Sequence, residues 1–300
     1  MLSILIPVYN FEVDLLVMQL SEQCMAIGIA YEIVCADDGS DEIWRQKNAS
    51  LNSINSCFYI ELNQNIGRSR IRNFLVQKAK YDMLLFLDCD SGLRDENFIL
   101  NYVEYLNTRD VVSGGRAYQD SAPENHEFLL HYTYGVKRES QFAEIRNQNV
   151  YRSFHSNNFL VSRDIILKFP FDESLLLYGH EDTRWALNLE KNNIEILHID
   201  NPVIHLGLED NNVFLRKQCD AIENIIKLKR SGNSIGSKVE DAYLFLEEFY
   251  FLNLYRLIFS WSERQLVRNL MSKSPNLFFL DIFRLGIYCR IWKKQQETYY

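Results

Sequence analysis

Residues 83–90 read MLLFLDCD, five consecutive apolar side chains that run directly into two aspartates with one residue between them. An apolar run of this length, bounded by polar residues, is typical of a buried strand. Buried strands normally end in ordinary turn residues. Two carboxylates at this point therefore indicate either an acidic turn or a ligand site at the mouth of a core strand.

The first hundred residues repeat this arrangement. Short apolar runs begin at residues 2, 31 and 57, as LSILIPV, YEIVCA and CFYIEL, and longer mixed stretches separate them. Strands that alternate with helical patterns predict βαβ units and a largely parallel sheet. In such open sheets, ligands bind outside the carboxyl ends of the strands.

Polar residues follow three of these strands, as PVYN at 7–10, DDGS at 37–40 and DCDSG at 88–92. Each ending taken alone is typical of a turn. Because the carboxyl ends of parallel strands meet at one edge of a sheet, the three endings together predict a site there.

The stretch 65–80, NIGRSRIRNFLVQKAK, has apolar residues at helical spacing and predicts a helix. Three cations crowd its first turns: Arg68, Arg70 and Arg72. The helix dipole is positive there and disfavours cations, so we expect an anionic partner. That partner is either a nearby carboxylate, such as one of the aspartate pairs, or a bound nucleotide.

Composition excludes several classes of protein. The 300 residues are 47% hydrophobic and 24% charged, as in soluble globular proteins, and suffice for one large domain or two smaller ones. The net charge of −8 argues against a general nucleic-acid binder. The six cysteines are scattered without a CxxC pair, which predicts reduced and mostly buried thiols.

The first ten residues, MLSILIPVYN, are apolar but lack a basic region before them, and are interpreted as a first strand and not as a signal peptide. No window reaches the roughly 18 uncharged apolar residues of a membrane span. We therefore expect a cytoplasmic protein.

Between residues 111 and 205 the pattern changes. DVVSGGRAY, from residue 110, predicts a strand, and GHED at 179–182 precedes a helix that contains Trp185. Acids suit the first turn of a helix, so a capping role is the alternative to a functional one for Glu181 and Asp182. IEILHIDNPVIHLG predicts two short strands about Pro202 that end in His205, which is either a structural histidine or a ligand.

The last part of the chain is rich in aromatic residues, as in DAYLFLEEFYFLNLYRLIFSW at 241–261. From Ser262 onward seven Lys or Arg stand against three Asp or Glu, a local net charge of +4. A packed helical extension explains this pattern. The alternative is a basic, aromatic helix pair that lies on an anionic membrane surface.

Five motifs, in order and approximate spacing, resemble family 2 glycosyltransferases of the GT-A fold: SILIPVYN, ADDGS, NIGRSRIRN, LLFLDCD and FDESLLLYGHEDTRWALNLEKNN followed by a histidine. The resemblance covers roughly residues 2–206. The chain departs from the family pattern at Ser91, where a third acid is common, at DGSDE in place of DGSTD, and at Pro170, where a glycine commonly precedes FDE. None of these departures removes a reacting carboxylate.

The resemblance implies an α/β protein with a GT-A fold, in which a Rossmann-like mixed, mostly parallel sheet is flanked by helices and followed by a C-terminal helical extension. Residues 1–110 would form the nucleotide-sugar-binding half and residues 111–215 the acceptor-binding half. Residues 216–300 would form the extension.

The implied activity is inverting transfer of a hexosyl or N-acetylhexosaminyl group from a UDP-sugar to an acceptor hydroxyl. A divalent cation, Mn²⁺ or Mg²⁺, would neutralise the charge that builds on the leaving diphosphate. The implied ligands are Asp90, Asp88 and His205, and an imidazole ligand suits manganese better than magnesium. At a strand end, two aspartates two residues apart would project to the same side, roughly 7 Å between Cα atoms.

The family positions that contact the nucleotide are matched by Pro7, Tyr9, Asp38, Asn65, Arg68, Arg72 and Asp88. The carboxylate of Asp38 would accept the uracil imide N–H. An acceptor hydroxyl has a pKa far above neutrality and needs a general base. By resemblance that base is Asp182, with Glu181 holding the acceptor.

The implied acceptor is a surface polysaccharide or a lipid-linked saccharide at the inner face of the cell membrane, with a peripheral membrane contact through the extension and no nucleic acid. One alternative is a nucleotidyltransferase, which usually has a glycine-rich basic loop after its first strand, unlike PVYNFEVDLL. The other is a catalytically silent homologue that binds a sugar nucleotide or a glycan. It would be favoured had DCD or HED lost an acid.

Overall fold

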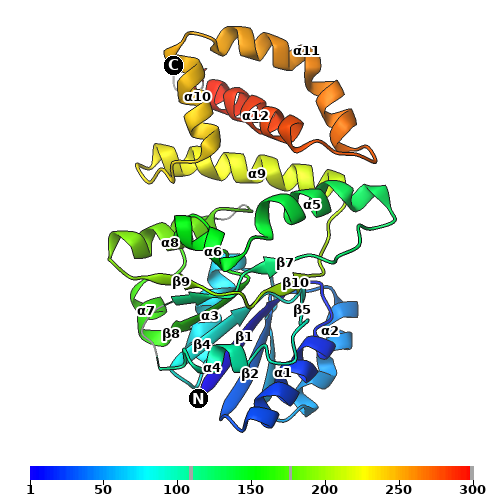
Figure 1. Ribbon diagram of the computed structural model, residues 1–300, viewed down its shortest axis with the longest axis vertical. Coiled ribbons are helices and arrows are strands. Elements are labelled where there is room, and N and C mark those ends of the chain that lie inside the picture. Colours follow the sequence, from blue (N-terminus) through cyan, green and yellow to red (C-terminus); the bar gives the residue numbers. More distant parts are fainter. Residues whose placement is uncertain (108–110, 176–177, 298–300) are drawn as a thin grey trace. The chain divides into compact units, whose positions relative to one another are not determined.

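The computed structural model describes residues 1–107, 111–175 and 178–297 and contains a mixed sheet flanked by helices (Figure 1). Within these residues the strand order is β3-β2-β1-β4-β8-β6-β9. The strands are β1 Leu2–Val8, β2 Tyr31–Asp37, β3 Cys57–Glu61, β4 Met83–Leu87, β6 Val111–Ser113, β8 Asn158–Ser162 and β9 Ile196–His198. Strand β8 is antiparallel to β4 and β6, and the other pairs are parallel. The predicted α/β class and mostly parallel sheet are confirmed.

The chain divides into two units. The sheet unit comprises Met1–Gln119, Glu139–Leu176 and Glu181–Gly207, and the helical unit comprises Asp120–Arg138, Leu177–His180 and Leu208–Tyr300. The functional boundaries expected at residues 110 and 215 stay a prediction, and residue 110 lies outside the described part of the chain.

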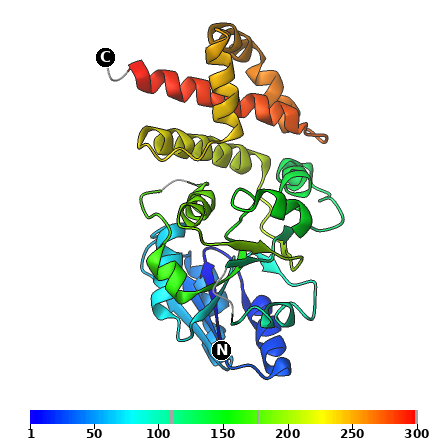
Figure 2. The same ribbon diagram turned by 60° about the vertical axis from the view of Figure 1, so that its left-hand side comes forward.

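Helices cover both faces of the sheet because side chains alternate along each strand. Leu2 and Ile4 pack with α1 on one face, whereas Leu5 packs with α3 and α8 on the other. Figure 2 shows α1 and α3 on opposite sides of the strands. The helices of this unit are α1 Asp14–Ile27, α2 Glu42–Asn48, α3 Arg68–Lys78, α4 Leu100–Val103, α6 Ala143–Arg146, α7 Arg163–Lys168 and α8 Glu181–Lys191.

A small second sheet interrupts the strand expected at DVVSGGRAY. Strand β6 ends at two positions that require glycine. A Cβ on Gly114 would lie 2.3 Å from the Tyr102 hydroxyl, and Gly115 has φ of +90°. Residues Arg116–Ala117 then form β7, which joins β5 (Ser91–Gly92) and β10 (Val203–His205) in the order β5-β10-β7. The glycine break thereby carries Arg116 to a different sheet from Val112.

The paired aspartates of DCD lie in a turn and not in an extended strand. Strand β4 ends at Leu87, and the amide of Ser91 donates to the carbonyl of Asp88 at 3.2 Å. The expected strand geometry of Asp88 and Asp90 is therefore wrong. A turn gives the two carboxylates different surroundings, whereas alternate residues of a strand share one face.

The C-terminal helical extension is confirmed. In the helical unit α12 packs against α9, α10 and α11, and a Cβ on Gly286 of α12 would lie 2.2 Å from the Phe259 ring. The helices are α5 Leu129–Tyr134, α9 Asn211–Arg230, α10 Lys238–Glu248, α11 Leu252–Leu270 and α12 Leu277–Glu297. No helix among the described residues has the length and apolar character of a membrane span.

All six cysteines carry free thiols, as predicted. Four are buried, and Cys89 and Cys219 are half-buried. Burial raises the pKa of the Cys24 thiol to about 12, so this thiol is protonated and unreactive at neutral pH.

The buried His198 connects β9, the edge strand of the main sheet, to the segments around it. Nδ1 of His198 lies 2.8 Å from Nη1 of Arg146, and Nε2 lies 2.9 Å from the carbonyl oxygen of Val150. Because a guanidinium only donates, Nδ1 accepts and Nε2 carries the proton, which leaves the ring neutral. Burial lowers the pKa of His198 from its ordinary 6.5 to about 4.

We predict an acid-sensitive contribution of His198 to stability. Because its pKa is lower in the folded protein than in the unfolded chain, the contribution is complete above pH 6.5 and is lost as the pH falls towards 4, by about 3 kcal/mol. Denaturant unfolding of the wild type and His198→Gln, which does not titrate, should show a stability difference that shrinks over this interval. A constant difference would contradict the assignment.

Candidate functional site

The polar residues predicted to converge do so at one edge of the main sheet. Strands β2, β1 and β4 run parallel and end there, and the antiparallel β8 begins there. The order β2-β1-β4-β8 places Asp38 at one end of this edge and Asp88 two strands along it. At about 4.8 Å per strand the two positions are roughly 10 Å apart along the edge.

Asp38 is buried and holds the loop that leads into α3. Its Oδ1 accepts from the amide of Ile66 at 2.7 Å, and its Oδ2 accepts from the amide of Gly67 at 3.1 Å. A Cβ on Gly39 would lie 2.5 Å from the backbone of Gln64, so only glycine permits this approach. Burial raises the pKa of Asp38, and the two amides oppose the rise. A carboxylate has about four lone-pair positions, so it can still accept from a ligand.

Three more of the predicted nucleotide residues lie at the same edge. Pro7 pairs with Ala36 in the register of β1 and β2 and is half-buried. The side chain of Tyr9 is 51% exposed, and Asn65 is also exposed. An exposed aromatic ring and a buried carboxylate at one sheet edge offer a stacking surface and a hydrogen-bond acceptor for a base.

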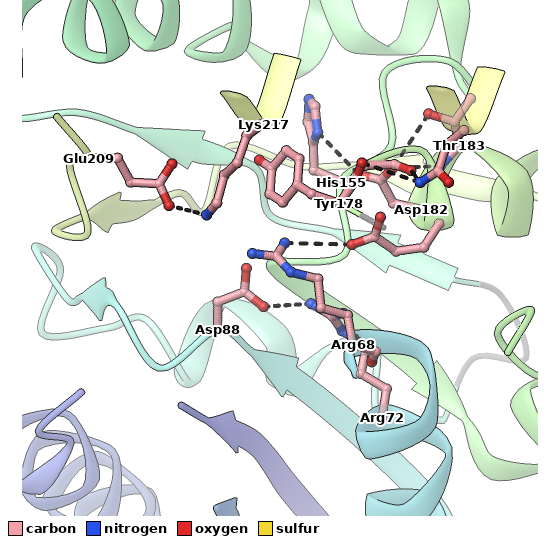
Figure 3. Close-up of polar contacts among 12 residues, drawn as sticks. Arg68, Arg72, Asp88, His155, Tyr178, Asp182, Thr183, Glu209 and Lys217 are labelled. Carbon is pink, nitrogen blue, oxygen red and sulfur yellow. Dashed lines mark hydrogen bonds and ion pairs between the residues drawn. The ribbon is translucent and has the colours of Figure 1, made fainter. Parts of the chain in front are cut away.

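The arginines at the start of α3 each have a carboxylate partner. Nη2 of Arg72 lies 2.7 Å from Oδ1 of Asp88, and both side chains are drawn in Figure 3. Nη1 of Arg68 lies 3.5 Å from Oε1 of Glu181. Arg70 pairs similarly with Glu173 at 3.6 Å. The expected anionic partners are therefore carboxylates from three other segments, and one is from the DCD pair.

Asp90 lies beside His205, as expected for two ligands of one metal. Oδ2 of Asp90 is 3.3 Å from Nδ1 of His205, and the two side chains are 24% and 9% exposed. The antiparallel pairing of His205 with Ser91 brings them together. Burial opposes ionisation of Asp90, but His205, Arg116 and Arg68 outweigh it and lower the pKa of the carboxyl.

The third predicted ligand, Asp88, faces two guanidinium groups instead. Besides Arg72, Nη2 of Arg116 lies 3.7 Å from Oδ2 of Asp88. Within the described residues no three His, Cys, Asp or Glu side chains gather in a way that could hold a metal. The protein brings together Asp90 and His205 but not Asp88 with them.

This pair nevertheless fits a divalent cation. A Cβ on Gly207 would lie 2.2 Å from Oδ2 of Asp90, so only glycine lets the backbone lie directly against that oxygen. A carboxylate oxygen and an imidazole nitrogen are both common ligands of divalent cations. Cations that act on phosphates commonly take one or two protein ligands and complete their coordination with phosphate oxygens and water.

The two acids of GHED begin α8 and differ in their surroundings. The side chain of Glu181 is 8% exposed and pairs with Arg68, whereas that of Asp182 is 22% exposed. Oδ2 of Asp182 lies 3.5 Å from Nδ1 of His155, and Oδ1 accepts from the amide of Thr183 at 2.7 Å (Figure 3). Asp182 is thus the more accessible acid, held by an imidazole that can help to orient it.

Two residues of this site, Arg116 and His155, are not identified from the sequence. Arg116 bridges Asp88 and Glu139, with Nη1 3.0 Å from Oε2 of Glu139. Burial opposes its charge, but Glu139, Tyr118 and the two aspartates of DCD raise the pKa of Arg116. The two glycines before Arg116 are the only sequence sign of a special position. His155 has no such sign, because its contact with Asp182 depends on tertiary structure.

Comparison with known proteins gives matches to glycosyltransferases. Residues 3–167, more than half of the chain, match the family model for Glycosyl transferase family 2. A chondroitin synthase of Escherichia coli is 31% identical over 132 residues, which are 43% of this chain. The match spans only 19% of that protein's length.

Solved structures share the GT-A fold. Residues 1–349 of S. aureus TarS align over 98% of this chain and 91% of that one, with a TM-score of 0.51 and 16% identity. The mannosyltransferase PcManGT from Pyrobaculum calidifontis, solved with GDP-Man and Mn²⁺, aligns over 76% of this chain and 64% of that one, with a TM-score of 0.50 and 14% identity. At these identities the likeness concerns the fold alone.

Proposed function

Because the chain belongs to glycosyl transferase family 2 and so uses a nucleotide sugar as donor, we propose that it moves a hexosyl or N-acetylhexosaminyl group from a UDP-sugar to a hydroxyl of a growing glycan, with inversion. The observation that carries this proposal is the row of groups along one sheet edge. Asp38 follows β2, and Asp88 and Asp90 follow β4. Acidic side chains, Asp182 among them, also begin α8 in the same unit.

Asp38 and Tyr9 support a uracil base. The Asp38 carboxylate accepts the imide N–H of uracil, which cytosine lacks, and the exposed Tyr9 ring supplies a face for stacking. Guanine also carries a ring N–H, and PcManGT was solved with GDP-Man. GDP-mannose is therefore the informative competitor in a donor screen.

Asp90 and His205 would hold a divalent cation, Mn²⁺ in preference to Mg²⁺. Bound there, the cation supplies positive charge against the leaving diphosphate. PcManGT was solved with Mn²⁺, which agrees with this choice. Arg68 is half-exposed at the start of α3 and adds a positive charge beside Glu181. The buried Arg72 holds Asp88 in place.

Asp182 acts in this proposal as the general base. The acceptor hydroxyl must lose its proton as it attacks C1, and the carboxylate of Asp182 is accessible enough to receive that proton. His155 orients the carboxylate from 3.5 Å, and Glu181 holds the acceptor. Attack opposite the diphosphate converts an α-linked donor into a β-glycoside.

The acceptor side of the proposal is a surface polysaccharide or a lipid-linked saccharide at the inner face of the cell membrane. The name of the E. coli relative, a chondroitin synthase, agrees with a polysaccharide product. The extension would lie on anionic lipid. Four large apolar residues at helical spacing are exposed along α11, namely Leu254, Leu257, Ile258 and Trp261. Arg264 and Arg268 continue the same stripe and complement anionic headgroups.

A donor screen tests the proposed reaction. The protein would be incubated with UDP-sugars and GDP-mannose, with and without Mn²⁺ and glycan acceptors. We expect UDP release that depends on acceptor and Mn²⁺, and no release of GDP from GDP-mannose. Release of pyrophosphate would indicate nucleotidyl transfer, and binding without turnover would indicate a silent homologue. Either result would contradict the proposal.

Replacing Asp182 by Asn tests the base. We expect kcat to fall about 10²-fold or more, with little change in the KM of the donor, because the amide cannot accept a proton. Asp172→Asn is the matched control. This aspartate is partly exposed and lies 3.8 Å from Arg184. Steady-state rates near normal for Asp182→Asn would show that the residue serves only the first turn of α8.

The lipid contact is tested by sedimentation with vesicles that contain phosphatidylglycerol. Replacing Leu257 and Trp261 by Ser should weaken binding at least about tenfold, because the change removes two apolar side chains that would be buried in the lipid. The control is the same change at Leu15 and Met18, which are similarly exposed on α1. Equal binding of both double variants and the wild type would rule out this stripe as the membrane surface.

A further inference from the structure

The side-chain amide of Asn157 is buried and makes no hydrogen bond to another described residue. It is 3% exposed, and within residues 1–107, 111–175 and 178–297 neither its Nδ2 nor its Oδ1 has a partner. Proteins rarely bury a polar side chain in this way unless a ligand or water completes it. A side-chain amide whose donor and acceptor are both unused can bind hydroxyl groups of a ligand.

The next residue shows what a structural asparagine does at this position in the sheet. Oδ1 of Asn158 accepts from the Tyr102 hydroxyl at 2.7 Å. Its Nδ2 donates to the carbonyls of Gly115 at 3.0 Å and Asn201 at 2.8 Å. Asn158 therefore holds β8 to its neighbours, whereas the side chain of Asn157 makes no hydrogen bond to any residue that the structure describes.

Register places Asn157 beside the DCD turn. Leu87 pairs with Asn158, and the amide of Asp88 donates to the carbonyl of Asn157 at 3.0 Å. Phe159 stacks on Phe86 in the core on the α3 face of the sheet. Asn157 lies in the turn just before β8, but its bond with Asp88 continues the β4–β8 ladder by one pair. Because side chains alternate along such a ladder, Asn157 is placed on the same face as Phe159.

Other unused polar atoms belong to elements on the same face. Ser69 Oγ and Arg72 Nε of α3 and Glu181 Oε2 of α8 are buried, and none has a hydrogen-bond partner within the described part of the chain. Both helices pack on this face of the sheet. One isolated unpaired atom can reflect local geometry, but four residues of three segments indicate a polar ligand with several hydrogen-bonding groups.

The order of the strands indicates which part of the donor would lie at Asn157. Along the edge, Asp38 follows β2, the DCD turn follows β4, and Asn157 precedes β8. With the base at Asp38 and the diphosphate at the turn, the transferred sugar extends over β8. Resting on the proposed function, we infer that Asn157 contacts the transferred sugar, where its amide accepts from one hydroxyl and donates to another and so helps to select the donor.

The test compares nucleotide with nucleotide sugar in Asn157→Ala. We expect calorimetry to give an affinity for UDP within about twofold of the wild type. Affinity and kcat/KM should fall at least about tenfold for whichever of UDP-glucose, UDP-galactose and their N-acetylhexosamine counterparts the wild type uses. The melting temperature should stay unchanged, because the substitution removes no hydrogen bond within the protein.

Asn158→Ala is the matched control. Because this side chain makes three hydrogen bonds, its loss should lower the melting temperature and weaken UDP and UDP-sugar together. Monodeoxy forms of the accepted donor sharpen the test. A donor that lacks the hydroxyl bound by Asn157 should be used equally by the wild type and Asn157→Ala, because neither enzyme can make that hydrogen bond.

The inference fails if Asn157→Ala leaves UDP-sugar binding unchanged in an active enzyme, which would mean that an internal water completes the amide. It also fails if UDP and UDP-sugar weaken equally, which would place the nucleotide at Asn157. A wild-type protein that binds no nucleotide sugar would instead contradict the proposed function, and the inference with it. A screen of the wild type therefore separates the two failures.

Discussion

The ion pair between Arg72 and Asp88 is the interaction on which the rest of the site depends. The guanidinium is 3% exposed and lies 2.7 Å from the carboxylate, so each charge requires the other. Removing one partner of a buried pair typically costs about 3–5 kcal/mol, because the remaining charge is left uncompensated. The pair thereby locks α3 to the turn that follows β4. Arg116 adds a second contact to the same aspartate and ties in the small sheet that carries His205.

This arrangement separates the tasks of the two aspartates of DCD. Asp88 is held by Arg72 and Arg116, whereas Asp90 lies against His205 and the backbone of Gly207. The turn from Asp88 to Ser91 makes the separation, because an extended strand would have aimed both carboxylates to one side. Two acids with one residue between them can thus supply one structural anchor and, in the proposed function, one metal ligand.

Much of the fold follows from local patterns in the sequence. The apolar runs at β1 to β4 and the helical face of α3 are strong signals, and turn residues after three strands correctly indicate one shared edge. The break at Gly114 does not follow from the sequence, because it depends on the Tyr102 hydroxyl. The contacts of His155 with Asp182 and of Arg116 with Asp88 also join distant segments. Likewise, the adjacent Asn157 and Asn158 are distinguished only by what surrounds them.

The central claim is that a nucleotide sugar lies along the sheet edge from β2 to β8. A crystal structure of the protein with Mn²⁺ and a non-transferable UDP-sugar analogue tests it most directly. The account predicts uracil against Asp38 and Tyr9, the diphosphate and metal at Asp90 and His205, and the sugar over Asn157. A nucleotide bound in the reverse direction, or away from this edge, would contradict it.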